Sequence, residues 1–108
     1  MKITLYPVLE SKQLNVSVAG EKITINGEVI DLLVIPQGYR LPANAVENEW
    51  MVSGSYIERD ADGEMTIELR FPVLWDSPES VRAPKTPTVL QVSHGKVKFP
   101  SVEAVEND

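Results

Sequence analysis

The chain has 108 residues, 43% of them hydrophobic, with ten basic against sixteen acidic residues and a formal net charge of −6. This length fits one domain, and no apolar run approaches the roughly 18 residues of a membrane-spanning helix. The absence of cysteine excludes disulfides, thiolate metal sites and cysteine nucleophiles. Because the basic residues are scattered, direct binding to nucleic acid is disfavoured. The N-terminus lacks the apolar core of a signal peptide, so we expect a cytoplasmic protein.

The first third of the chain predicts a β-meander. Residues 1–8 alternate as a strand does, and residues 14–19 alternate strictly before a glycine turn. Asn26-Gly27 favours a type I′ turn, because both central positions of that turn need positive φ. A two-residue loop there places Ile23 opposite Ile30 and gives the ribbon one apolar face and one polar face.

The middle of the chain predicts one core strand and one short helical turn. Leu32–Ile35 is entirely apolar and is predicted as a strand covered on both faces, ending before Pro36. A single helical turn is expected near residues 42–47, with Pro42 at its first position. We predict no other helix in the chain.

A second hairpin is predicted after this turn. Residues 50–59 form its outgoing strand, residues 60–63 its loop, and residues 64–71 a return strand with strict alternation. Gly54 interrupts the outgoing strand and indicates a bulge or a close approach of another backbone.

The last third changes in composition. Four prolines punctuate residues 72–87, which we expect to form a long irregular connection, and long loops of this kind are often functional. Residues 88–92 and 96–99 are predicted to form a short hairpin about Ser93-His94-Gly95. The expected organisation is one β domain over residues 1–100 and a flexible acidic tail over residues 101–108.

The predicted fold class is therefore all-β. Antiparallel meander and hairpin strands are expected to form either a small sandwich or a partly open barrel. Local alternation does not decide between them, because strand order depends on long-range pairing. Unpaired edge strands would offer backbone groups to a partner or to a second copy of the chain.

No residue pattern indicates catalysis, a cofactor or a metal. His94 is the only histidine, and no nucleophile-elbow motif accompanies it, so we interpret it as an exposed turn residue. Asp60 and Asp62 offer oxygen atoms suited to calcium, but the full EF-hand pattern is missing. Turn geometry is the preferred explanation of these acidic residues. We predict that the protein is not an enzyme.

The candidate partner contacts are Leu74, Trp75 and Arg82, all within the proline-rich connection. A tryptophan in such a loop can be an exposed anchor for a protein partner. The alternative, which we favour from the sequence, is that Trp75 folds back onto the sheet with Phe71 and Trp50.

Several segments resemble a family of small uncharacterised proteins of tailed bacteriophages and of prophages in Gram-negative bacteria. These segments are Lys22–Leu32, Leu41–Val46, Glu49–Val52, Ile57–Arg59, Met65–Pro72, Pro78-Glu79 and Arg82–Pro84. The resemblance lies in the order and spacing of these segments, which extend over residues 22–84. Residues 73–76 depart from the family, in which a histidine-containing segment follows the second hairpin.

The resemblance implies a gene near those for tail components and carries no catalytic residues over to this chain. It predicts an accessory protein that binds a phage structural protein during tail or virion assembly. The expected location is the host bacterial cytoplasm, with association with the virion as an extension of it. The alternative function is an acidic inhibitor or nucleic-acid mimic that binds a basic host protein, for which the net charge is the positive feature.

Overall fold

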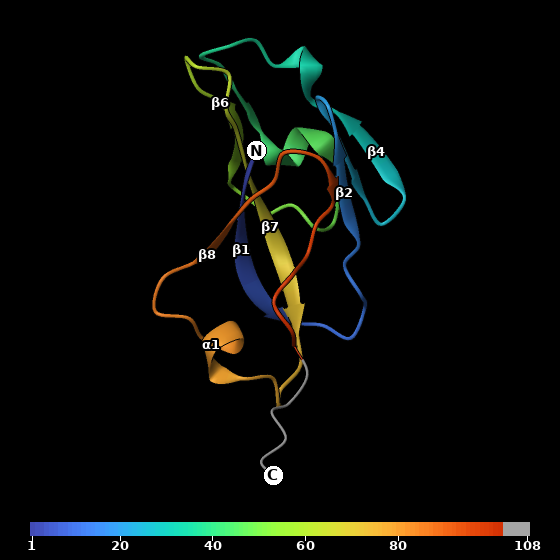
Figure 1. Ribbon diagram of the computed structural model, residues 1–108, viewed down its shortest axis with the longest axis vertical. Coiled ribbons are helices and arrows are strands. Elements are labelled where there is room, and N and C mark those ends of the chain that lie inside the picture. Colours follow the sequence, from blue (N-terminus) through green and yellow to red (C-terminus); the bar gives the residue numbers. More distant parts are fainter. Residues whose placement is uncertain (103–108) are drawn as a thin grey trace.

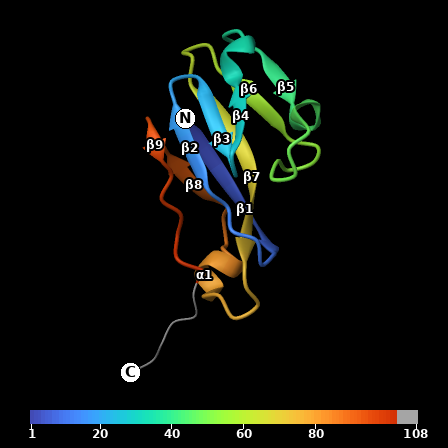
Figure 2. The same ribbon diagram turned by 90° about the vertical axis from the view of Figure 1, so that its right-hand side faces the viewer.

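The structure is a computed structural model that describes residues 1–102, and it has the predicted all-β fold. Two sheets pack face to face as a sandwich, one of the two predicted arrangements (Figures 1 and 2). No helix within residues 1–102 is long and apolar enough to cross a membrane.

The large sheet has the strand order β5-β6-β7-β1-β8, and the small sheet has the order β4-β3-β2-β9. The strands of the large sheet are β5 (Arg40–Pro42), β6 (Tyr56–Arg59), β7 (Met65–Val73), β1 (Lys2–Leu9) and β8 (Thr88–Gln91). Those of the small sheet are β4 (Glu28–Asp31), β3 (Lys22–Ile25), β2 (Val16–Ala19) and β9 (Gly95–Lys96). Three short helical turns lie between strands: η1 (Leu32–Val34), η2 (Ala43–Val46) and α1 (Glu79–Arg82).

The hairpin of β3 and β4 has the predicted turn and register. Asn26 and Gly27 have φ values of 47° and 85°, and Ile23 lies opposite Ile30. The Asn26 side chain also accepts a hydrogen bond from the Asn15 backbone at 2.6 Å and donates one to the Gln13 carbonyl at 3.0 Å. The turn therefore holds the segment that leads into β2.

The centre of the large sheet differs from the antiparallel expectation. β1 runs parallel to β7, with Ile3 opposite Ile67 and Leu5 opposite Leu69. After β1 the chain crosses to the small sheet, where it forms β2, β3 and β4. It then returns to the large sheet, where it forms β5 and β6 before β7. This long connection between β1 and β7 is what permits parallel pairing.

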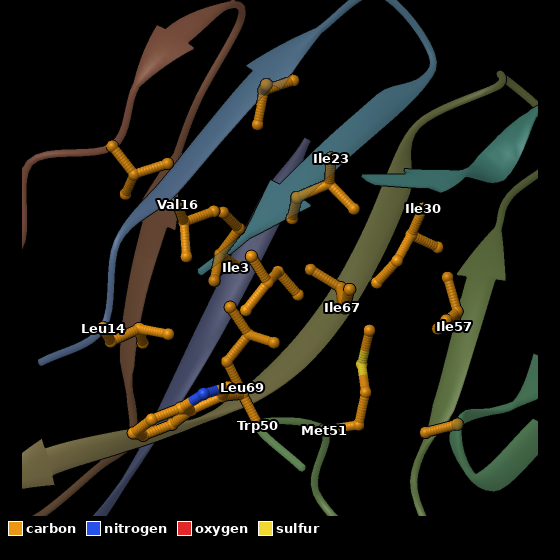
Figure 3. Close-up of a cluster of buried hydrophobic side chains, with 14 of the residues drawn as sticks. Ile3, Leu14, Val16, Ile23, Ile30, Trp50, Met51, Ile57, Ile67 and Leu69 are labelled. Carbon is orange, nitrogen blue, oxygen red and sulfur yellow. The ribbon is translucent and has the colours of Figure 1, made fainter. Parts of the chain in front are cut away.

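The core lies between the two sheets. Alternate residues of β1 and β7 face alternate residues of β2 and β3, so the inner faces interdigitate (Figure 3). The fully buried side chains include Ile3, Leu5, Val16, Ile23, Ile25, Ile57, Ile67 and Leu69. Trp50 and Met51 cover the core from the segment before β6 (Figure 3).

The predicted core strand at Leu32–Ile35 is wrong. Leu32–Val34 form the 3-10 turn η1, in which Leu32 is buried while Leu33 and Val34 are exposed, and the buried Ile35 follows as its C-cap. The Asp31 carboxylate accepts a hydrogen bond from the Leu33 backbone at 2.9 Å, which caps the turn. An acceptor at this position starts a helical turn in spite of the apolar run that follows.

The other helical turns and the second hairpin agree with the sequence only in part. η2 lies in the region predicted near residues 42–47, but it begins at Ala43, and Pro42 is its N-cap and not its first residue. The prediction of no other helix is wrong, because α1 lies within the connection predicted to be irregular. Gly54 does interrupt the outgoing strand, but as a tight turn and not as the predicted bulge or close backbone approach: its φ is 83°, the Ser55 amide donates to the Val52 carbonyl, and the space around Gly54 is open. Only residues 56–59 continue as β6.

The predicted last hairpin is also wrong. β8 pairs with β1 in the large sheet, whereas β9 pairs with β2 in the small sheet. The segment about His94 is therefore a crossing between sheets. Of the predicted acidic tail, residues 103–108 lie outside the described residues, while the half-buried Val102 accepts a hydrogen bond from Ser77.

Arg59 links the two sheets through a buried guanidinium. Its Nε donates to the Ile35 carbonyl at 2.7 Å, and its Nη2 donates to the Leu32 carbonyl at 3.1 Å. The same Nη2 lies 2.6 Å from the Glu21 carboxylate, and the Glu21 carbonyl accepts from the Leu32 amide. Arg59 therefore fastens η1 and the turn between β2 and β3 to β6, and it satisfies carbonyls that a strand would have paired elsewhere.

We expect the two members of this ion pair to contribute unequally to stability. Arg59→Met removes donors from two backbone carbonyls and should lower the free energy of unfolding by about 2–3 kcal/mol. Glu21→Gln removes a half-exposed charge and should cost about 0.5 kcal/mol or less. Urea unfolding of both variants checks this, and equal losses would contradict it.

Candidate protein-binding surface

The parallel pairing of β1 and β7 brings the carboxyl ends of both strands to one end of the molecule. Leu9 lies opposite Val73, and the Glu10 amide donates to the Val73 carbonyl at 3.2 Å. Beyond this pair, large apolar side chains are exposed: Leu9 at 71%, Leu74 at 41% and Trp75 at 81%. We call Leu9, Leu74 and Trp75 the end surface; it lies where β7 leaves the sheet near α1 (Figure 1).

The favoured prediction that Trp75 folds back onto the sheet is wrong. Trp50 is buried at 3% exposure without it, and Phe71 packs against Phe99 with ring centroids 5.4 Å apart. Phe99 therefore supplies the aromatic cover that we expected from Trp75. Sequence reasoning missed this role of Phe99, because its alternation places it in a hairpin that does not form.

Hydrogen bonds hold the backbone of the loop that carries Trp75. Buried Ser77 accepts a hydrogen bond from the Leu74 amide at 2.8 Å through its hydroxyl, and its own amide donates to the Leu74 carbonyl. The hydroxyl donates in turn to the Val102 carbonyl. Two exposed apolar side chains are thus displayed on a closed turn, so ordering this loop on binding would cost little further entropy.

Arg82 has a position that the sequence did not reveal. It is exposed at the end of α1, and its Nε donates to the Ser77 carbonyl at 3.2 Å. Of the three predicted contacts, Leu74 and Trp75 lie next to each other at the end surface. Arg82 is not part of that surface and instead binds the backbone of the loop at Ser77. Leu9, which the sequence analysis did not select, joins them through the register of β1 and β7.

An open groove adjoins the end surface. It has a volume of about 510 Å³, and Leu74 forms part of its wall. Its apolar lining also includes Leu14, Phe71 and Phe99, and Lys12 and Lys96 are among its polar lining residues. The end surface is therefore continuous with a concave, partly apolar region.

An open trough lies on the outer face of the large sheet. Tyr6, Val8 and Arg70 line it together with residues 48, 49 and 51–53. The Tyr6 hydroxyl donates to the Glu68 carboxylate at 2.7 Å. This hydrogen bond is the main cause that raises the pKa of Tyr6 above its usual value, and desolvation and the negative charge of Glu68 act in the same direction.

The other residues considered from the sequence do not meet in a site. His94 is exposed in the crossing between β8 and β9. The Asp60 carboxylate accepts hydrogen bonds from the Asp62 and Glu64 amides, both at 2.9 Å, as expected of a residue that shapes a turn. Within residues 1–102, no three His, Cys, Asp or Glu side chains are placed to hold a metal ion.

The negative charge of the chain is concentrated towards its end in the sequence. Three of the sixteen acidic residues, Glu103, Glu106 and Asp108, lie beyond the described part of the chain. Residues 1–102 therefore carry thirteen acidic and ten basic residues, a formal net charge of −3. The folded sandwich is only mildly acidic.

Comparison of the chain with protein-family models, with curated proteins and with solved structures finds no match.

The two tryptophans should respond differently to a soluble quencher. Trp75 is exposed and should be quenched readily by acrylamide, whereas Trp50 is buried and should be protected. Trp75→Phe should remove the quenchable part of the emission and change the free energy of unfolding by less than about 0.5 kcal/mol. The emission that Trp75→Phe removes is the emission of Trp75. If acrylamide quenched this part of the wild-type emission only weakly, the exposed position of Trp75 would be contradicted.

Tyr6 should titrate above the ordinary range of tyrosine. Because its pKa is raised in the folded state, the stability that its hydrogen bond contributes is intact below the unfolded-state pKa and is lost as the pH rises through the folded-state value. Ultraviolet titration of the wild type and of Tyr6→Phe isolates this residue by difference. Glu68→Gln should move the transition to lower pH, and an unchanged transition would overturn the assignment.

Proposed function

We propose that this protein is an accessory protein of a tailed bacteriophage or prophage that binds a structural protein during tail or virion assembly, and that it does so through the end surface. The observation that carries the binding part of this proposal is the exposure of Trp75 on a loop whose backbone is held by Ser77. The phage context rests on the resemblance described from the sequence.

Water covers the apolar side chains of the end surface in the free protein. Exposed tryptophan next to exposed leucine leaves a large apolar area hydrated, and a partner that covers it gains the free energy of burial. Tryptophan is among the residues that most often dominate binding energy when they enter a pocket on a partner. A loop already closed by Ser77 and Arg82 keeps that side chain displayed.

The partner chemistry follows from the composition of the end surface. Leu9, Leu74 and Trp75 are uncharged, and the adjoining groove is lined by Leu14 and other apolar side chains. A partner that fits them presents an apolar pocket or ridge. Such a contact depends weakly on salt, whereas an acidic inhibitor or nucleic-acid mimic that binds a basic protein would depend on it strongly.

Affinity capture from cells in which the phage or prophage is induced tests this function. The tagged wild type should recover a tail or virion structural protein, identified by mass spectrometry, and recovery should persist at high salt. Trp75→Ala should reduce it by about tenfold or more, as expected for loss of a binding hot spot.

Tyr39→Ala is the matched control, because Tyr39 is an exposed aromatic residue outside the end surface. This variant should recover the same partner as the wild type. Recovery of a basic host protein that is lost at high salt, or equal recovery with Trp75→Ala, would contradict the proposal.

A further inference from the structure

β8 is an edge strand of the large sheet without the usual protection. It pairs with β1 on one side, and no strand of residues 1–102 pairs with it on the other (Figure 1). Its four residues, Thr88–Gln91, carry no charge, and Val89 is 55% exposed on the outer face. An uncharged edge of this kind is a template for another strand.

The hydrogen-bond pattern shows which backbone groups are free. Val92 donates to the Met1 carbonyl at 2.9 Å, so these two residues form a hydrogen-bonded pair of the antiparallel ladder. Such pairs alternate, and Ile3 with Leu90 is therefore the next hydrogen-bonded pair. It follows that the N–H and C=O groups of Val89 and Gln91 point away from β1, towards the open edge.

The three other edges differ from β8. β5 spans three residues and ends in Pro42, which has no N–H, and β9 spans two residues. β4 begins with Glu28 and ends with Asp31, so two copies aligned along β4 would bring four carboxylates to one seam. Charge at the ends of β4 is a common device against such pairing, and β8 lacks it.

We propose that β8 pairs with β8 of a second copy of this chain, antiparallel about a two-fold axis at Leu90. In this register Val89 and Gln91 exchange hydrogen bonds with Gln91 and Val89 of the second copy, which satisfies the free groups of both edges. Leu90 lies beside its symmetry mate on the inner face, and Val89 lies beside Gln91 on the outer face. The contact is isologous and closes on itself, so it yields a dimer and not a filament.

This dimer is independent of the proposed partner contact. The end surface lies beyond the end of β7, whereas the pairing edge is the main chain of β8. Loss of dimerisation in a β8 variant should therefore leave capture through Trp75 intact, and Trp75→Ala should leave dimerisation intact. The two proposals can fail separately.

Sedimentation velocity over a wide range of protein concentration tests the pairing. The wild type should change from a monomer of 12.0 kDa to a dimer as the concentration rises. Val89→Lys places ammonium groups of the two copies on neighbouring strands and should weaken dimerisation by about tenfold or more. Val29→Lys is the matched control, because Val29 is an equally exposed valine, at 61%, on the edge strand β4; it should leave the dimer unchanged.

Hydrogen exchange of the unmodified protein gives a readout that needs no variant. The amides of Val89 and Gln91 should exchange fast at low concentration and become protected at high concentration, while the Leu90 amide is protected throughout. A protein that remains monomeric at every concentration would overturn the proposal. A dimer that is weakened by Val29→Lys but not by Val89→Lys, or that forms without protecting the Val89 and Gln91 amides, would overturn it as well.

Discussion

The parallel pairing of β1 with β7 is the constraint on which the rest of the structure depends. It places the first strand of the chain in the interior of the large sheet, with β7 on one side and the edge strand β8 on the other. It directs the carboxyl ends of both strands to one end of the molecule, where Leu9 meets the loop of Leu74 and Trp75. It also leaves β8 as an edge strand of the large sheet. The two surfaces for which we propose partners thus follow from one pairing.

Features of the fold that depend on neighbours in the chain could be predicted from the sequence. The Asn26-Gly27 hairpin depends on turn chemistry, because both residues have a positive φ, and Gly54 marks the point where the outgoing strand is interrupted. Features that depend on distant residues could not. The apolar run Leu32–Ile35 favours a strand, but the Asp31 carboxylate caps a helical turn there, and Arg59, 27 residues beyond Leu32, donates hydrogen bonds to the Leu32 and Ile35 carbonyls. In the same way, nothing local in β1 reveals the direction of β7.

The candidate surface was predicted in part for a similar reason. A tryptophan in a proline-rich connection is visible in the sequence, so Leu74, Trp75 and Arg82 could be selected. Whether Trp75 covers the core depends on Phe99, which reaches Phe71 only because β8 and β9 belong to different sheets. The support given by Ser77 depends on the Val102 carbonyl, 25 residues away. The contribution of Leu9 depends on a register that only the parallel pair defines.

Site-specific photo-cross-linking in cells tests the central claim, that Trp75 contacts a phage structural protein, most directly. Trp75 is replaced by p-benzoylphenylalanine, the phage or prophage is induced, and the cells are irradiated before assembly is complete. We expect a cross-link from this position to a tail or virion structural protein, and none from the same replacement at exposed Tyr39. A cross-link to that protein from Tyr39 but not from Trp75, or one from Trp75 to a basic host protein alone, would contradict it.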